Sequence, residues 1–116
     1  MIADDEDDIR SIVKMVFTKL GFEVISDSNG GLVEKLDRDL PDLIILDINL
    51  NNKDGGDICA RLKKNLRTRH IPIILISAIM DLKQISQYCG ADDYLIKPFN
   101  ISQLENKVIM HLQHAA

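Results

Sequence analysis

Acidic and basic side chains stand directly after several apolar runs of this 116-residue sequence. Five acids occupy residues 4–8, Asp47 ends the run DLIILD, and Lys97 follows the segment DYLI. Several carboxylates in one crevice repel each other strongly unless a hard divalent cation lies among them. Oxygen ligands from Asp5 and Asp47, a backbone carbonyl of the following loop and water would suit Mg²⁺, with Mn²⁺ as an alternative. The residue types therefore predict a magnesium site.

The same residues carry the chemical groups that are needed to form and hold an aspartyl phosphate. A carboxylate oxygen of Asp47 could attack a phosphorus atom in line while the metal neutralises the charge of the phosphoryl group. The Lys97 ammonium and the hydroxyl of Ser77, which ends the run IPIILIS, could bind the remaining phosphoryl oxygens. The pattern therefore indicates phosphoryl transfer to Asp47.

The other acids of residues 4–8 have separate expected roles. We expect Asp7 to cap the first helix and Asp8 to lie in its first turn, where the helix dipole favours negative charge. Glu6 is expected to be solvated. Without the five acids the net charge of −4 becomes +1, so the acidity is a local feature, which is typical of a site.

Composition indicates one globular domain over residues 1–116. Hydrophobic residues make up 46% of the chain and charged residues 28%, which argues against a disordered chain. The apolar runs are far shorter than the roughly 20 residues that span a bilayer, and no signal-peptide pattern opens the chain. We therefore expect a cytoplasmic protein without membrane contact, with Cys59 and Cys89 as free thiols in the core.

Strands and helices are predicted to alternate along the chain. Apolar runs predict strands at 1–3, 22–26, 42–47, 71–77 and 93–96, the first of them short, with a loop at 48–56. Helical spacing predicts five helices through these apolar positions, the last helix being capped by Asn100: Ile9, Ile12, Val13, Val16, Phe17 and Leu20; Leu32, Val33, Leu36 and Leu40; Ile58, Cys59 and Leu62; Leu82, Ile85 and Tyr88; Leu104, Val108 and Leu112. The order βαβαβαβαβα predicts an α/β fold, a three-layer, doubly wound, five-stranded parallel sheet (βα)5.

Sites in open α/β sheets form beyond the carboxyl ends of the strands. The residues at the predicted strand ends are those with the chemistry described above: Asp4, Asp5, Asp47, Ser77 and Lys97. The predicted fold class would therefore bring them to one edge of the sheet.

Four segments of the sequence resemble the receiver domain of bacterial two-component response regulators. They read ADDEDDIR, LIILDINLNNKDG, IPIILISA and GADDYLIKPF, and the resemblance extends over essentially the whole chain. It implies a flavodoxin-like, CheY-like fold and a cis peptide bond between Lys97 and Pro98. It also implies these roles: phosphoacceptor, Asp47; acidic pair of the metal site, Asp4 and Asp5; metal ligand through its backbone carbonyl, Asn49; switch hydroxyl, Ser77; switch aromatic, Tyr94; phosphoryl-binding lysine, Lys97.

The sequence departs from the family pattern at three places. Asn51 stands where the family commonly has proline, Ser77 stands where threonine is commoner, and the first strand is short. None of these departures removes a chemical group that the reaction needs. We therefore expect the chain to be competent for phosphorylation.

The resemblance also implies the partners. A histidine kinase or a phosphotransfer protein would donate the phosphoryl group. Phosphorylation would draw Ser77 inward and let Tyr94 turn inward, which changes the face formed by the fourth helix, the fifth strand and the fifth helix. A downstream effector domain or protein, or a second copy of the chain, would bind that face. The basic stretch RLKKNLRTRH lacks aromatic residues and a recognition motif, so we expect no direct nucleic-acid binding.

Two other functions fit part of the sequence. A haloacid-dehalogenase-like phosphatase also uses an aspartate nucleophile after an apolar strand, but it usually needs a second acid two residues later, where Asn49 stands. An unphosphorylated pseudo-receiver would act through constitutive contacts, and the presence of Asp5, Asp47 and Lys97 argues against it. We expect a phosphoacceptor that assists its own phosphorylation and is not a turnover enzyme.

Overall fold

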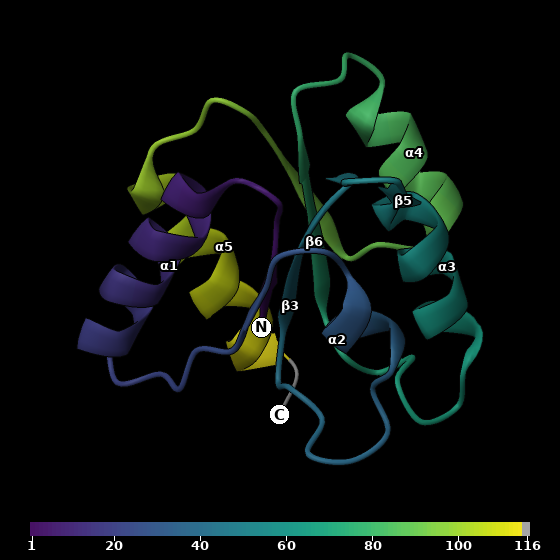
Figure 1. The fold of residues 1–116 in the computed structure, drawn as a ribbon, viewed down its shortest axis with the longest axis horizontal. Helices are drawn as coiled ribbons and strands as arrows, with labels where there is room; N and C mark the ends of the chain where they lie inside the picture. The colour runs from purple at the N-terminus through teal and green to yellow at the C-terminus, as the bar shows by residue number, and fades with distance from the viewer. Residues whose placement is uncertain (115–116) are drawn as a thin grey trace.

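The computed structural model describes residues 1–114, which form a five-stranded sheet with helices on both faces (Figure 1). The strands of the main sheet are β1 (Ile2–Ala3), β2 (Ser26–Asp27), β3 (Ile44–Asp47), β6 (Ile73–Ser77) and β7 (Asp93–Ile96). The helices are α1 (Asp7–Lys19), α2 (Gly31–Glu34), α3 (Gly55–Lys64), α4 (Leu82–Cys89) and α5 (Ile101–His114). Two further strands, β4 (Asn49–Leu50) and β5 (Lys53–Asp54), form a separate small sheet. Among the described residues, no helix is both long and apolar enough to cross a membrane.

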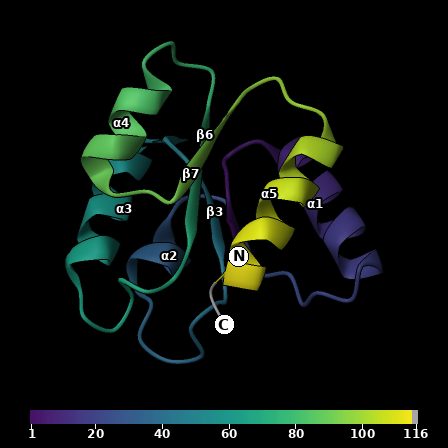
Figure 2. The same cartoon turned by 180° about the vertical axis from the view of Figure 1, so that it is seen from behind.

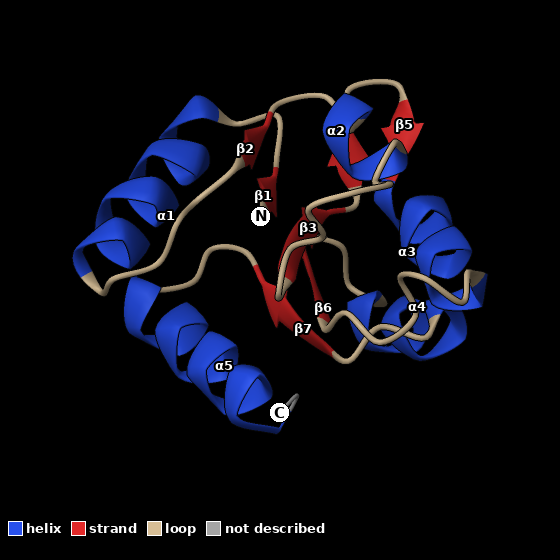
Figure 3. Cartoon of the chain, turned by 90° about the horizontal axis from the view of Figure 1, so that it is seen from below, coloured by secondary structure: helices blue, strands red, loops and turns tan. Residues whose placement is uncertain are grey.

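The main sheet is parallel throughout, with the strand order β2-β1-β3-β6-β7. Helices α1 and α5 cover one face, and α2, α3 and α4 cover the other (Figures 1 and 2). The view from below shows the sheet between these two helical layers (Figure 3). The chain extends the sheet first to one side of β1 and then to the other, which makes the fold doubly wound. The predicted fold class is therefore confirmed.

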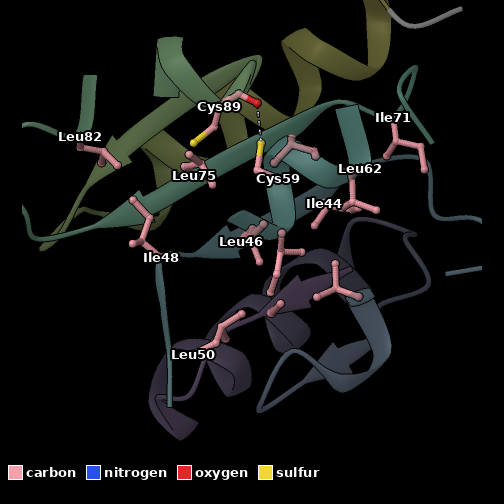
Figure 4. Packing of buried hydrophobic residues seen from close by; sticks show 14 residues of the cluster. Ile44, Leu46, Ile48, Leu50, Cys59, Leu62, Ile71, Leu75, Leu82 and Cys89 are labelled. Atoms are coloured by element: carbon pink, nitrogen blue, oxygen red, sulfur yellow. Dashed lines mark hydrogen bonds between the residues drawn. The ribbon is translucent and has the colours of Figure 1, made fainter. Parts of the chain in front are cut away.

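The two central strands β3 and β6 are buried on both faces, and their side chains alternate between two cores. One core, beside α2, α3 and α4, contains Ile44, Leu46, Ile73, Leu75, Ile58, Leu62 and Leu82 (Figure 4). The other, beside α1 and α5, contains Ile45, Ile74, Ile76, Val13, Phe17, Leu104 and Val108. Because both faces are covered, these strands are apolar up to their last residues, Asp47 and Ser77, as their sequence predicts.

Both cysteines are buried free thiols in the first core, as predicted. The Cys59 thiol donates to the carbonyl oxygen of Cys89 over 3.7 Å, which links α3 to the end of α4 (Figure 4). Burial raises the pKa of the Cys59 thiol to about 12, so this group stays protonated and acts as a small apolar side chain.

The second strand and the second helix are much shorter than predicted. The predicted strand at 22–26 is wrong over most of its length, because β2 spans only Ser26–Asp27. β2 is an edge strand that pairs with β1, and the two residues of β1 limit the length of the ladder. Helix α2 has four residues and ends well before the predicted position at Leu40.

A buried carboxylate, rather than helical periodicity, sets the start of α2. Asp27 is 3% exposed, and its Oδ1 accepts hydrogen bonds from the backbone N–H groups of Asn29 (3.2 Å) and Gly30 (3.0 Å). Its Oδ2 accepts from Leu32 (3.0 Å) and Val33 (2.9 Å). These bonds satisfy N–H groups that would otherwise lack partners at a helix start.

The segment predicted as a loop at 48–56 contains an antiparallel hairpin. Asn49 of β4 pairs with Asp54 of β5. At the turn, Asn51 has a φ of 55°, in the left-handed region that asparagine tolerates and that proline cannot adopt. The asparagine at this position therefore suits the hairpin, where the proline common in the family would not fit.

The ends and faces of the helices differ from the prediction at several residues, and among the predicted apolar positions Ile12, Leu20 and Leu32 are exposed. The predicted cap by Asp7 is wrong, because α1 begins at Asp7, whose side chain pairs with Arg10 instead. Tyr88 is 92% exposed and does not belong to the buried face of α4. Asn100 caps α5 as predicted, since its Oδ1 accepts from a backbone N–H of the first turn. The Lys97–Pro98 peptide bond is cis, as predicted.

Candidate functional site

The carboxyl ends of β1, β3, β6 and β7 lie at the upper edge of the main sheet in Figure 1. Asp4 follows β1, Asp47 and Ser77 are the last residues of β3 and β6, and Lys97 follows β7. In a parallel sheet these positions are neighbours because all strands point the same way. The fold therefore brings side chains from distant parts of the sequence to one place.

Four acids converge at this edge. Asp4, Asp5, Glu6 and Asp47 each offer a carboxylate oxygen, and these oxygens lie within 4.8 Å of one another. Asp4 is fully buried and Asp47 is 3% exposed, whereas Asp5 and Glu6 are exposed. Burying two neighbouring carboxylates is costly unless positive charge compensates them.

One buried oxygen of this cluster lacks a hydrogen bond. Oδ2 of Asp4 has no hydrogen-bond partner, although the Lys97 ammonium forms an ion pair with it over 3.0 Å. A buried carboxylate oxygen without a hydrogen bond, beside other carboxylates, matches the hard oxygen donors that a divalent cation prefers. The residues present therefore fit Mg²⁺.

Lys97 contacts three of the four acids. Its Nζ lies 3.0 Å from Asp4, 3.0 Å from Oε1 of Glu6 and 3.3 Å from Oδ2 of Asp47. Burial acts to lower the pKa of Lys97, but the three carboxylates outweigh burial and hold this pKa well above its usual range. The ammonium is therefore a fixed positive charge beside Asp47.

Asp47 is the most perturbed carboxylate of the site. Burial and, to a smaller extent, the negative charge of Asp4 raise the pKa of Asp47 to about 6, against the opposing effects of Lys97 and the backbone N–H of Asn49. That N–H lies 3.3 Å from Oδ1 of Asp47. Near neutral pH the Asp47 carboxylate is therefore ionised, and it is held by the Lys97 ammonium and the backbone N–H of Asn49.

Asp5, in the loop after β1, forms a hydrogen bond with the hairpin that follows β3. Its Oδ2 accepts a hydrogen bond from the backbone N–H of Asn51 over 3.4 Å. Asn49 lies two residues after Asp47 and is exposed. The loop after β1 and the hairpin after β3 therefore form adjacent walls of the site.

Ser77 and Tyr94 occupy the strands on the other side of Asp47. Ser77 is 3% exposed, and its Oγ accepts from the backbone N–H of Ile79 over 3.3 Å. Asp47 pairs with Ile76 in the β3–β6 register, which places Ser77 one residue further toward the edge. Tyr94 is half-buried and packs against the first core.

Two residues of the site were not predicted from the sequence. The expectation that Glu6 is merely solvated is wrong, because its carboxylate contacts Lys97. Gly55 lies directly under the site: a Cβ on this residue would lie 2.1 Å from the backbone oxygen of Asp47. No sequence signal revealed the reach of Glu6, but the GG pair after Asp54 could have indicated a close backbone approach.

The chain matches the response regulator receiver domain family over residues 1–109. It is 34% identical over 118 aligned residues to the probable transcriptional regulator ycf27 of Porphyra purpurea, an alignment that covers 99% of this chain and 47% of that protein. The chain therefore spans about half the length of such curated relatives.

Two solved structures have a similar overall fold. The signal receiver domain of a signal transduction histidine kinase from Syntrophus aciditrophicus is 31% identical with a TM-score of 0.88, covering 97% of this chain and 88% of that one. The receiver domain of the Francisella response regulator 1452 is 26% identical with a TM-score of 0.87, covering 99% and 96%. One relative is a regulator and another is part of a kinase, so similarity leaves the output open.

Proposed function

Because the chain belongs to the response regulator receiver domain family, we propose that it accepts a phosphoryl group on Asp47 from a histidine kinase or a phosphotransfer protein. The observation that supports this role is the position of Asp47, a buried carboxylate at a strand end that contacts the Lys97 ammonium over 3.3 Å. A location in the cytoplasm is part of the proposal.

The transfer moves a phosphoryl group from a histidine nitrogen of the donor to a carboxylate oxygen of Asp47. A carboxylate oxygen of Asp47 forms a bond to phosphorus as the bond from phosphorus to the donor histidine nitrogen breaks, and the released imidazole takes up a proton. Lys97 balances the negative charge on the phosphoryl oxygens, and the hydroxyl of Ser77 donates to one of them. The acyl phosphate later hydrolyses, so the chain is a phosphoacceptor rather than a turnover enzyme.

Magnesium is the proposed cofactor, with Mn²⁺ as an alternative. Asp4, Asp5 and Asp47 would hold it, together with the backbone carbonyl of Asn49, as the resemblance implies. When bound, the ion supplies positive charge that neutralises the phosphoryl group. The buried Oδ2 of Asp4, which has no hydrogen-bond partner, and the convergence of four acids support this assignment.

The proposed output is a change of the face formed by α4, β7 and α5. Ser77 moves toward the phosphoryl group and Tyr94 turns into the space it leaves, so the population shifts between two packings of the same fold. An effector domain or protein, or a second copy of the chain, would bind this face.

Incubation with acetyl phosphate and Mg²⁺ tests the proposal. Mass spectrometry should detect the gain of one phosphoryl group, which Asp47→Asn and removal of the metal with EDTA should each abolish. Asp57→Asn, the same change at an exposed residue of α3, is the matched control and should retain the gain. Turnover of p-nitrophenyl phosphate would instead indicate a phosphatase, and absence of any mass gain would indicate an unphosphorylated pseudo-receiver.

A further inference from the structure

The contact between Glu6 and Lys97 has no place in the reaction described above. Glu6 Oε1 lies 3.0 Å from Nζ of Lys97 and accepts a hydrogen bond from it. Lys97 also donates to Asp47, and Asp4 lies 3.0 Å away. Three carboxylates therefore surround an ammonium that has three N–H groups.

Phosphorylation changes what the ammonium must neutralise. Lys97 now donates to Asp47 and to Glu6, and a phosphoryl group on Asp47 replaces the first of these acceptors with anionic oxygens that compete with Glu6 for the ammonium. The contact with Asp47 therefore passes to the phosphoryl group, and the contacts with Asp4 and Glu6 are the ones that can weaken as it arrives. Which contact gives way depends on what each carboxylate gains or loses without the ammonium.

Exposure separates the two carboxylates that remain, Asp4 and Glu6. The side chain of Asp4 is fully buried, whereas that of Glu6 is 57% exposed. A buried carboxylate that loses its cation is destabilised because no water replaces the lost interaction, whereas water can hydrate the exposed carboxylate of Glu6. Glu6 and Lys97 also line one open pocket of about 380 Å³, together with Ala78, Pro98 and Phe99. Breaking the contact between Lys97 and Glu6 therefore requires less free energy than breaking the contact between Lys97 and Asp4.

We propose that Glu6 is a positioning residue that holds Lys97 in the unphosphorylated state and competes with the phosphoryl group for its ammonium. The inference rests on the proposed function, because it concerns the step in which Asp47 gains the phosphoryl group. Glu6 thereby slows phosphorylation and favours the unphosphorylated form.

Two variants of Glu6 distinguish the effect of its contact with Lys97 from the effect of its negative charge. Glu6→Gln removes the charge, and Glu6→Asp keeps the charge but shortens the side chain by one methylene, so that its carboxylate no longer reaches Lys97. Both should raise the rate constant for phosphorylation by acetyl phosphate about two- to fivefold, the range expected for a partly exposed ion pair. Asp8→Asn removes a charge from the exposed first turn of α1 and should leave the rate unchanged.

A second readout reports Lys97 without phosphorylation. The NMR resonance of the Lys97 ammonium should shift in both Glu6 variants and stay in place in Asp8→Asn, a difference that a general change of stability would not produce. If Glu6→Asp matches wild type while Glu6→Gln is faster, the effect is one of charge alone and the inference is wrong. It is also wrong if both variants match wild type in rate. A wild-type chain that takes no phosphoryl group refutes the proposed function itself, which distinguishes the two failures.

Discussion

The carboxylate of Asp47 is buried beside the carboxylate of Asp4, and this neighbourhood raises the pKa of Asp47 to about 6 from an ordinary value of 3.8. A carboxyl group whose pKa is higher in the folded state than in the unfolded state stabilises the fold when protonated. That stabilisation is complete below pH 3.8 and is lost as the pH rises through 6. At neutral pH, ionised Asp47 therefore costs stability in the absence of metal.

Asp47→Asn should stabilise the metal-free chain by about 1–2 kcal/mol at pH 7.5, because asparagine keeps the shape and removes the charge. The difference from wild type should shrink toward zero near pH 4. Urea unfolding in EDTA at the two pH values measures it. Adding Mg²⁺ should raise the stability of wild type more than that of the variant. Equal stability of the two chains at pH 7.5 would contradict this account.

The strand-end rule predicts most of the site but not all of it. Asp4, Asp47 and Lys97 meet because parallel strands end at one edge, and the sequence alone shows where those strands end. The contact of Glu6 could not be predicted in this way, because Glu6 is the last residue of the loop after β1, away from a strand end, and reaches Lys97 through a long side chain. Such a contact depends on the fold as a whole and leaves no local pattern.

At the scale of the elements, α3 begins unusually close to β3. The backbone N–H of Gly55 donates to the carbonyl oxygen of Ile48 over 2.7 Å, and a Cβ on Gly55 would lie 2.1 Å from the backbone oxygen of Asp47. Since that atom belongs to the backbone of a buried strand, it cannot move aside easily. The absence of a side chain at Gly55 therefore allows α3 to begin directly against the backbone of Asp47.

Gly55→Ala should destabilise the chain by about 3 kcal/mol and should also reduce phosphorylation, because the strain falls on the backbone of Asp47. Gly56→Ala is the matched control, since its Cβ would meet side-chain atoms of Asp54 and Cys89 at 3.1 and 3.2 Å, which can adjust. Urea unfolding of both variants measures the difference. Similar stability of the two variants would show that the close approach at Gly55 is unimportant.

The elements that the sequence predicts well are those whose environment is uniform. β3 and β6 are covered on both faces, so all their residues before the terminal Asp47 and Ser77 are apolar, and the strands can be recognised without knowing their neighbours. β2 was predicted too long because its two-residue partner β1 limits the ladder. The start of α2 is set by the side chain of Asp27, which apolar periodicity does not reveal. The β4–β5 hairpin depends on the left-handed conformation of Asn51, which apolar periodicity does not reveal.

At the scale of the whole molecule, the last strand and the last helix are joined by charged groups as well as by the core. Asp93 of the edge strand β7 contacts Nζ of Lys107 (2.8 Å) and Nε2 of His111 (2.9 Å), both on α5. Nζ of Lys107 also lies 5.9 Å from the centroid of the Tyr94 ring. These contacts hold α5 against the strand that positions Lys97, so they link the proposed output face to the site.

Burial acts to raise the pKa of Asp93, but its hydrogen bonds with Lys107 and His111 outweigh burial and lower this pKa below 3.8. A lowered carboxyl pKa stabilises the fold above the unfolded value, and the effect is lost as the pH falls through the folded value. Asp93→Asn should therefore cost about 1–2 kcal/mol at pH 7, and the cost should shrink as the pH falls below 4. Urea unfolding across this range measures it, with Asp57→Asn as the exposed control. A cost that is the same at pH 7 and pH 3 would mean that packing, not the ion pairs, joins α5 to β7.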